Sequence, residues 1–329
     1  MRDLYKREID YMRISITDRC NLRCGYCMPC GVEWIPMEQI LTYEEIAAVC
    51  KEAAKLGICK IKITGGEPLV RKGCPALVRM IKSVPGIDQV TLTTNGVVLR
   101  EFAEELKEAG VDGINVSLDT LDKIKFEKIT GFDRLQDVLD GIEKALAAGI
   151  RVKINTVLMP GINETAWKDM VLLAEKKPLD IRFIEMMPIG SGNGIASVSN
   201  RDVLRELENI YGELEIDNEV HGNGPAVYHR IPGFTGGVGF ISAIHGKFCA
   251  GCNRIRMTAK GEIKPCLCYG ESISIRDVLR QQGEQSADED ITEKIRKILE
   301  EAVLRKPKAH CFEERREITE MKKMAQIGG

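Results

Sequence analysis

Short apolar runs alternate with amphipathic stretches from residue 12 to about residue 210. Six of these runs are rich in Ile, Val and Leu and have the length of buried strands. They predict strands at Met12–Thr17, Cys59–Thr64, Gln89–Thr94, Gly113–Leu118, Arg151–Leu158 and Asp180–Met186.

Between these runs, apolar residues recur at helical spacing. The spacing predicts helices at Tyr43–Leu56, Cys74–Ser83, Leu99–Ala109, Arg134–Ala148 and Glu164–Lys176. Three of them stop at a glycine that precedes a strand (Gly57, Gly110 and Gly149), the usual C-terminal cap. Strands that alternate with helices predict an α/β fold with a parallel sheet. Periodicity alone does not separate an open doubly wound sheet from an incomplete barrel.

The pattern changes near residue 211, where glycines become frequent and only short apolar runs follow, such as Ala226–Ile231 and Val238–Ile244. We therefore predict two domains: a larger α/β domain over residues 1–230 and a smaller, less regular α+β domain over residues 231–329.

Composition limits the classes of function. A net charge of −2 gives the chain no general attraction for nucleic acid or for an acidic membrane. No apolar run is long enough to span a bilayer, and the charged segment Met1–Asp10 lacks the apolar core of a signal peptide. These features predict a cytoplasmic protein without nucleic-acid or membrane partners. In that reducing compartment, twelve cysteines indicate metal binding rather than disulfides.

The first cysteine group is Cys20, Cys24 and Cys27, spaced C-x3-C-x2-C directly after the first predicted strand. Thiolates hold cluster iron, and three of them leave one iron of a four-iron cluster open to another ligand. A zinc site normally takes four ligands, and the nearest further thiol is Cys30. This group therefore predicts a 4Fe–4S cluster with one open iron.

The second cysteine group is Cys249, Cys252 and Cys266, with Cys268 as a competing ligand. Its spacing alone fits a zinc ribbon as well as a cluster. Arg254 and Arg256 come just after Cys252, and residues two apart in a strand face the same side. A guanidinium pair suits phosphate, although the pair could also be solvated surface. Because the first group already implies cluster chemistry, we favour a second cluster beside an anion site.

The loop from Cys20 to Cys27, with the sequence CNLRCGYC, resembles the signature loop of the radical SAM superfamily. This resemblance implies that the open iron binds S-adenosylmethionine (SAM), which is cleaved to a 5′-deoxyadenosyl radical. The segment Thr64–Pro68, with the sequence TGGEP, resembles the motif that contacts the methionine part of SAM. The cofactor-binding residues implied in this way are Tyr26, Gly66, Ser117 and Met187.

Nearly the whole chain is similar to the GTP 3′,8-cyclase family, the MoaA type of radical SAM enzyme, which acts first in molybdenum cofactor biosynthesis. The similarity rests on Arg13, the segment Leu92–Gly96, Lys153, Arg182, the second cysteine group with its arginines and the terminal pair Gly328 and Gly329. It implies an incomplete parallel (β/α)6 TIM-like barrel with a small C-terminal α+β iron–sulfur domain.

The same resemblance implies two 4Fe–4S clusters and SAM as cofactors. The second cluster would be held by Cys249, Cys252 and Cys266, and the catalytic residues would be Gly328 and Gly329. The residues implied to bind GTP are Arg13, Lys62, Thr93, Lys153, Arg182, Arg254 and Arg256.

The implied reaction removes hydrogen from C3′ of GTP and joins C3′ to C8, giving 3′,8-cyclo-7,8-dihydro-GTP. Its implied partners are an electron donor such as a flavodoxin or ferredoxin and a cyclic pyranopterin monophosphate synthase that takes the product. A homodimer is left open. One alternative is a radical SAM peptide-modifying enzyme with an auxiliary cluster, which needs neither paired arginines nor terminal glycines. Another is an iron–sulfur electron carrier, which usually fills every ligand position with cysteine.

Overall fold

The computed structural model describes residues 1–28, 33–280, 288–312 and 318–328 of the chain. Its centre is a run of six parallel strands that pair in chain order. These strands are β1 (Tyr11–Ser15), β2 (Lys60–Thr64), β3 (Gln89–Thr94), β4 (Gly113–Ser117), β5 (Val152–Val157) and β6 (Leu179–Ile184).

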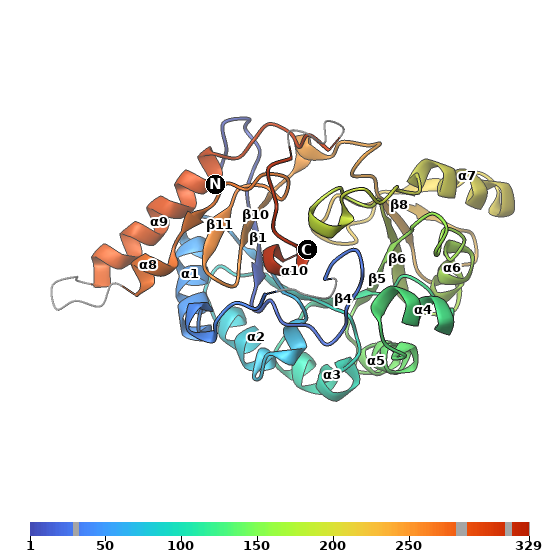
Figure 1. The fold of residues 1–329 in the computed structure, drawn as a ribbon, viewed down its shortest axis with the longest axis horizontal. Coiled ribbons are helices and arrows are strands. Elements are labelled where there is room, and N and C mark those ends of the chain that lie inside the picture. The colour runs from blue at the N-terminus through green and yellow to red at the C-terminus, as the bar shows by residue number, and fades with distance from the viewer. Residues whose placement is uncertain (29–32, 281–287, 313–317, 329) are drawn as a thin grey trace.

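Helices connect these strands and cover the outer side of the curved sheet (Figure 1). They are α1 (Tyr43–Lys55), α2 (Cys74–Lys82), α3 (Leu99–Glu108), α4 (Lys123–Thr130), α5 (Leu135–Ala147) and α6 (Trp167–Lys176). The predicted α/β class is confirmed, and the predicted strands and helices end within three residues of the observed ones. Helix α4 was not predicted.

The two faces of the sheet differ in polarity. In β1, Met12 and Ile14 are fully buried in the core between the sheet and its helices. Tyr11 and Arg13 point to the inner side, because successive side chains of a strand face opposite ways. The other parallel strands repeat this alternation, with Ile, Val, Leu or Phe outside and mainly polar residues inside. The inner side is therefore built as a site rather than as a packed core.

The last third of the chain extends both edges of this sheet. On one side β9 (Val238–Ile241) pairs in parallel with β6 and is followed by β8 (Val227–Arg230) and β7 (Glu215–Asp217). On the other side β10 (Arg254–Met257) pairs in parallel with β1. Two short strands follow it, β11 (Glu262–Lys264) and β12 (Ile273–Ser274). The sheet of the described residues is open, with β12 and β7 at its ends. The predicted domain boundary after residue 230 stays a prediction.

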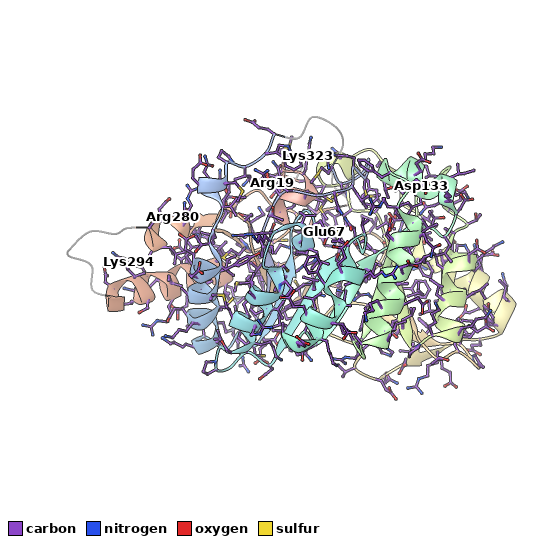
Figure 2. The ribbon with its side chains drawn as sticks, turned by 90° about the horizontal axis from the view of Figure 1, so that it is seen from below. Arg19, Glu67, Asp133, Arg280, Lys294 and Lys323 are labelled. Atoms are coloured by element: carbon purple, nitrogen blue, oxygen red, sulfur yellow. The ribbon has the colours of Figure 1, made fainter. Side chains whose placement is uncertain are left out.

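The remaining helices are α7 (Asn200–Tyr211), α8 (Arg276–Leu279), α9 (Asp288–Leu304) and α10 (Met324–Ile327). Helix α9 packs against α1. Lys294 of α9 and Arg280, which follows α8, are labelled at the same end of the molecule in Figure 2. Helix α10 lies in the middle of the ring of strands, so the end of the chain reaches the inner side of the sheet (Figure 1). None of the helices within the described ranges is long and apolar enough to cross a membrane.

Candidate active site

The inner side of the sheet bounds a cavity of about 390 Å³, a size typical of small-molecule sites. The predicted site residues among the described ones line this cavity, apart from Gly328, which lies beside it. The lining includes Arg13, Cys20, Cys24, Tyr26, Cys27, Lys62, Gly66, Thr93, Ser117, Lys153, Arg182, Met187, Cys249, Cys252, Arg254, Arg256 and Cys266. One cavity therefore brings together both cysteine groups and the predicted cations.

The two cysteine groups lie at opposite ends of the strands. The first group follows the C-terminal end of β1. Cys252 precedes β10, which runs parallel to β1 with Arg254 opposite Tyr11. Cys266 follows β11, which runs antiparallel to β10. The second group is consequently at the N-terminal end of the parallel strands, and the cavity extends between the two groups.

Backbone and side-chain donors surround the first cysteine group. The sulfur of Cys20 accepts hydrogen bonds from the backbone N–H of Leu22 at 3.4 Å and from Nδ2 of Asn95 at 3.6 Å. The backbone N–H of Ala325, in α10, donates to Cys27, whose pKa is nevertheless raised to about 12 by burial. These thiols must lose their protons to bind iron. Three partly exposed thiols on one cavity wall suit a cluster with an open iron.

The glycine pair at the end of β2 is required by close packing. A Cβ on Gly66 would lie 2.4 Å from the carbonyl oxygen of Arg19, and one on Gly65 would lie 2.6 Å from that of Thr17. The N–H of Gly66 donates to the carbonyl of Thr17 at 2.7 Å. The pair thus lets the end of β2 meet the cysteine loop, and its contact with SAM stays a prediction.

Glu67 is a buried residue whose part in the site the sequence did not reveal. Its carboxylate accepts hydrogen bonds from Thr94 Oγ1 at 2.7 Å and from the N–H of Asn95 at 2.6 Å. Burial raises its pKa to about 7. Figure 2 labels it in the middle of the molecule. Because Asn95 also contacts Cys20, Glu67 helps to fix the first cysteine loop on the end of β3.

Tyr26 and Asp119 hold the other side of that loop. The hydroxyl of Tyr26 donates to Oδ2 of Asp119 at 2.8 Å, and Oδ1 of Asp119 accepts from the N–H of Val157 at 2.8 Å. Burial raises the pKa of Asp119 to about 6. Tyr26 thus has a structural contact, and its contact with SAM stays a prediction. Asp119 lies two residues after the end of β4, and this position at a strand end was the available sequence signal.

A group of cationic side chains, here called the cation band, lines the cavity. Its members are Arg13, Lys62, Lys153, Arg182, Arg254 and Arg256. Arg256, Arg13 and Lys62 are register neighbours on β10, β1 and β2. Lys62 and Arg256 are only 8% and 7% exposed. Burial, followed by the charges of Arg182 and Arg13, holds the pKa of Lys62 well below its usual value. Grouped buried cations are costly unless an anion balances them, so this wall suits a phosphate chain.

The second cysteine group lies next to this band. Burial acts to raise the pKa of Cys252, but the charges of Arg254 and Lys306 outweigh it and bring that pKa to about 6. Lys306 donates to the carbonyls of Arg254 at 2.8 Å and Pro265 at 3.0 Å. A thiolate favoured by neighbouring cations is a ready metal ligand. Lys306 was not predicted, because it lies far from the cysteines in the sequence.

The tail of the chain is anchored beside the cavity. Gly328 has φ of +71°, and its carbonyl accepts a hydrogen bond from Nη1 of Arg256 at 2.7 Å. A Cβ at Gly328 would lie 3.0 Å from Cγ2 of Thr64 and 3.1 Å from Cβ of Ser15. Gly329 lies outside the described residues. Arg256 therefore holds the tail, a contact that the sequence did not reveal, and the catalytic role of the glycines stays a prediction.

Two family models match this chain. The model of the Radical SAM superfamily matches residues 14–174, and that of Molybdenum Cofactor Synthesis C matches residues 179–312. A GTP 3′,8-cyclase from Clostridium perfringens strain SM101 is 42% identical over 330 residues, which cover 100% of both chains. One from Pelotomaculum thermopropionicum is 44% identical, again over 100% of both chains. This chain belongs to the GTP 3′,8-cyclase family.

The fold is also similar to that of a more distant enzyme. The crystal structure of Streptococcus suis SuiB bound to S-adenosylmethionine matches with a TM-score of 0.61 at 16% identity. The match covers 88% of this chain and 68% of that one. At this identity the similarity supports the fold alone.

For this member of the GTP 3′,8-cyclase family, we predict that Cys266 rather than Cys268 is the third ligand of the second group. Cys266 and Cys252 lie close enough to Cys249 for their charges to raise the pKa of its thiol. The sulfur of Cys268 instead lies 3.3 Å from that of Cys311. Changing Cys266 to Ala should remove about half of the iron that the wild type binds after anaerobic reconstitution.

The matched controls are Cys268→Ala and Cys311→Ala, which each remove one partner of the other sulfur contact and should keep the iron. Iron loss in Cys268→Ala alone would contradict this ligand assignment. Cys30, the extra thiol near the first group, lies outside the described residues.

Proposed function

We propose that the cavity binds GTP along its cation band and that the chain converts it to 3′,8-cyclo-7,8-dihydro-GTP, the first step of molybdenum cofactor biosynthesis. The main observation that supports this proposal is that one cavity brings together two three-cysteine groups and a buried band of cations. Full-length relatives named GTP 3′,8-cyclase support the same function. The alternative, a radical SAM peptide-modifying enzyme, is not favoured, because such an enzyme does not need this band of cations.

The two cysteine groups fit two 4Fe–4S clusters. Cys20, Cys24 and Cys27 would hold the first cluster, and Cys249, Cys252 and Cys266 the second, since three thiolates leave one iron of each open. When bound, the first cluster and SAM together supply the radical that starts the reaction. Tyr26, Gly66, Ser117 and Met187, which line the cavity near the first group, would hold SAM.

The side chains of the cavity would bind, orient and shield GTP. Guanidinium forks from Arg13, Arg182 and Arg254 suit phosphate oxygens, and Thr93 adds a hydroxyl on the same wall. A fixed phosphate chain holds the ribose between the two cysteine groups, where C3′ and C8 can be brought together. The tail anchored by Arg256 helps to exclude water from the reacting atoms.

The proposed partners follow from the electron balance. After C3′ has joined C8, the product radical takes up one electron and one proton, which balance the hydrogen atom lost from C3′, and SAM cleavage consumes another electron. The proposed donor is a flavodoxin or ferredoxin, and the proposed acceptor of the product is a cyclic pyranopterin monophosphate synthase. Size-exclusion chromatography of the reconstituted enzyme tests whether it forms a homodimer.

The decisive experiment uses GTP deuterated at C3′. Reconstituted enzyme is incubated anaerobically with SAM, a reductant and this GTP. We expect deuterium in 5′-deoxyadenosine and a new nucleotide that chromatography separates from GTP. Separation is required because the product is an isomer of GTP. If SAM is cleaved but neither deuterated 5′-deoxyadenosine nor a new nucleotide is formed, the proposed function is wrong.

A test of the cation band is to change Arg254 and Arg256 separately to Ala. Each loss of a charge-assisted contact should weaken GTP binding by about 1.5–3 kcal/mol, roughly 10- to 150-fold. Arg256→Ala also frees Gly328, so its product yield should stay low at saturating GTP, whereas that of Arg254→Ala should recover.

Equilibrium dialysis of reconstituted protein measures these affinities. SAM cleavage should persist in both variants, and the exposed Arg201→Ala serves as the matched control. GTP affinity that stays at the wild-type value in both variants would exclude the two arginines from the substrate site.

A further inference from the structure

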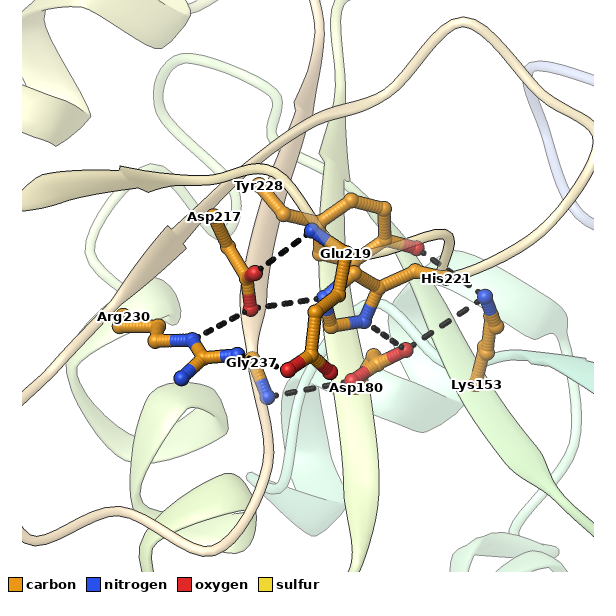
Figure 3. A network of polar contacts seen from close by, with 8 residues as sticks. All are labelled: Lys153, Asp180, Asp217, Glu219, His221, Tyr228, Arg230 and Gly237. Atoms are coloured by element: carbon orange, nitrogen blue, oxygen red, sulfur yellow. Dashed lines mark hydrogen bonds and ion pairs between the residues drawn. The ribbon is translucent and has the colours of Figure 1, made fainter.

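Charged residues form groups outside the cation band as well, toward both edges of the sheet. Near β6, the ring of His221 lies 3.1 Å from Oδ2 of Asp180 and 2.9 Å from Oδ2 of Asp217 (Figure 3). Near β10, Lys264 of β11 is 0% exposed and Glu320 is 3% exposed, and neither residue lines the cavity. The group near β10 differs from the other because Glu320 belongs to the C-terminal tail.

Lys264 and Glu320 form a buried ion pair. Nζ of Lys264 lies 2.5 Å from Oε2 of Glu320, and it also donates to the carbonyl oxygen of Tyr269 at 2.8 Å. A buried ammonium is costly unless an anion and hydrogen bonds balance it, and Glu320 supplies that anion. The charge of Lys264 therefore holds Glu320, and with it the tail over residues 318–328.

A second ion pair lies beside the first with its charges in the reverse order. Nζ of Lys322 lies 2.5 Å from Oε2 of Glu262. Glu262 and Lys264 are two residues apart in β11, so their side chains face the same way. The tail therefore runs in the opposite direction to β11, with Glu320 at Lys264 and Lys322 at Glu262. A shift of the tail by two residues would bring like charges together at one of these positions and leave Lys264 without a carboxylate.

The buried pair is linked through β10 to the far end of the tail. Lys264 of β11 and Arg256 of β10 are directly opposite each other, so their side chains lie on the same face of the sheet. Nη1 of Arg256 donates to the carbonyl oxygen of Gly328 at 2.7 Å. Two buried cations on one face thus hold the tail at residues 320 and 328, on either side of α10. A change at Glu320 is consequently expected to move Gly328.

Main-chain packing brings the tail close but does not specify its register. A Cβ on Gly270 would lie 2.8 Å from the carbonyl oxygen of Thr319, and one on Gly190 would lie 3.0 Å from that of Lys322. Every residue of the tail carries a carbonyl, so a shifted tail could make similar contacts. The order of the charged side chains is what distinguishes one register from another.

We propose that Glu262, Lys264, Glu320 and Lys322 form a charge clasp that sets the register of the tail and thereby places Gly328 at Arg256. Glu320 and Lys322 are positioning residues, since neither lines the cavity. Without the clasp the tail docks in more than one register, and SAM cleavage is uncoupled from product formation. The effect of the clasp on the product rests on the proposed function, whereas its effect on the docking of the tail does not.

The first test reverses the partly exposed pair, whose side chains are 39% and 23% exposed, so that the fold is not at risk. Lys322→Glu puts two carboxylates together and should speed hydrogen exchange of the tail amides by about fivefold. Mass spectrometry of reconstituted protein without GTP measures the exchange. The double variant Glu262→Lys with Lys322→Glu re-forms the pair and should restore most of the protection.

The second test changes the buried pair. Glu320→Ala leaves Lys264 without its anion and should raise tail exchange by at least about tenfold. At saturating GTP, the ratio of cyclised product to 5′-deoxyadenosine should fall by at least about tenfold, with KM for GTP unchanged. Glu320→Gln keeps the shape without the charge and should lose nearly as much, whereas Glu320→Asp keeps the charge and should recover part of the loss.

Met321→Ala is the matched control, because Met321 lies between the two tail members of the clasp but is 84% exposed. It should keep the wild-type exchange rate and product ratio. All of these variants should keep the wild-type iron content, GTP affinity and thermal unfolding, because the cysteines and the cation band are untouched.

Tail exchange as slow as in the wild type in both Lys322→Glu and Glu320→Ala would overturn the clasp, as would a double variant that exchanges as fast as Lys322→Glu alone. Fast exchange with a wild-type product ratio would overturn its link to the reaction. A wild type that shows the expected exchange pattern but makes no cyclised product would contradict the proposed function and leave the clasp standing.

Discussion

Changing Cys24 to Ala is expected to remove SAM cleavage completely, and all cyclised product with it. Cys24 belongs to the loop that would hold the first cluster, and two remaining thiols cannot retain a cubane that needs three protein ligands to leave one iron open. Cys20→Ala and Cys27→Ala should behave alike. The measurements are 5′-deoxyadenosine by chromatography and iron content after anaerobic reconstitution.

The matched control is Cys59→Ala, because Cys59 is a partly exposed thiol outside the cavity lining. It should keep both cleavage and iron. Cys252→Ala gives the complementary result: it should lose the second cluster and the product but keep some uncoupled SAM cleavage. The wild type should bind about eight irons, and about four would contradict the two-cluster prediction.

The parallel architecture could be predicted because its signals are local. The helix ends at Gly57, Gly110 and Gly149 need a left-handed residue, and all three glycines have φ between +70° and +89°. The buried faces of the strands also follow from a continuous spacing of Ile, Val and Leu. Helix α4 has a weaker pattern, although Asp122 caps its first turn by accepting from the N–H groups of Ile124 and Lys125. The sequence contained that cap signal, and apolar spacing alone overlooked it.

The position of the second cysteine group depended on long-range pairing. The sequence placed Arg254 and Arg256 on one face of a strand, and both line the cavity. It gave no sign that this strand joins β1 in parallel, more than two hundred residues away along the chain. That single pairing brings Arg256 next to Arg13 and sets the two cysteine groups at opposite ends of the cavity. Residue spacing cannot specify such a pairing.

Several residues of the site were missed because their role is to hold other residues. Glu67 positions Asn95 and the first cysteine loop, and Asp119 holds Tyr26. His221 shows no ligand spacing in the sequence, and only the fold brings it between Asp180 and Asp217. Motif residues are visible from type and spacing, whereas their supporting residues become visible when the strand ends are placed side by side.

Deleting Gly328 and Gly329, or changing both to Ala, is expected to lower the yield of cyclised product by at least about a hundredfold, the effect of a small misplacement of reacting groups. Gly328 ends helix α10, which already contacts the site, since the N–H of Ala325 donates to Cys27 and Met324 lines the cavity. Beyond that helix, Gly328 adopts φ of +71°, which side chains disfavour. Its carbonyl oxygen accepts a hydrogen bond from the buried guanidinium of Arg256.

The deletion should leave the clusters, the fold and GTP affinity largely intact, because the cysteines and the other cations of the band keep their places. Iron content, thermal unfolding and equilibrium dialysis with GTP measure these three properties, and chromatography measures the product. Met321→Ala is the matched control, since Met321 is in the same segment but 84% exposed. A frayed end would make no contact that matters to the reaction. A deletion variant that forms product at the wild-type rate would therefore show that the tail has no part in the reaction, whatever its contact with Arg256.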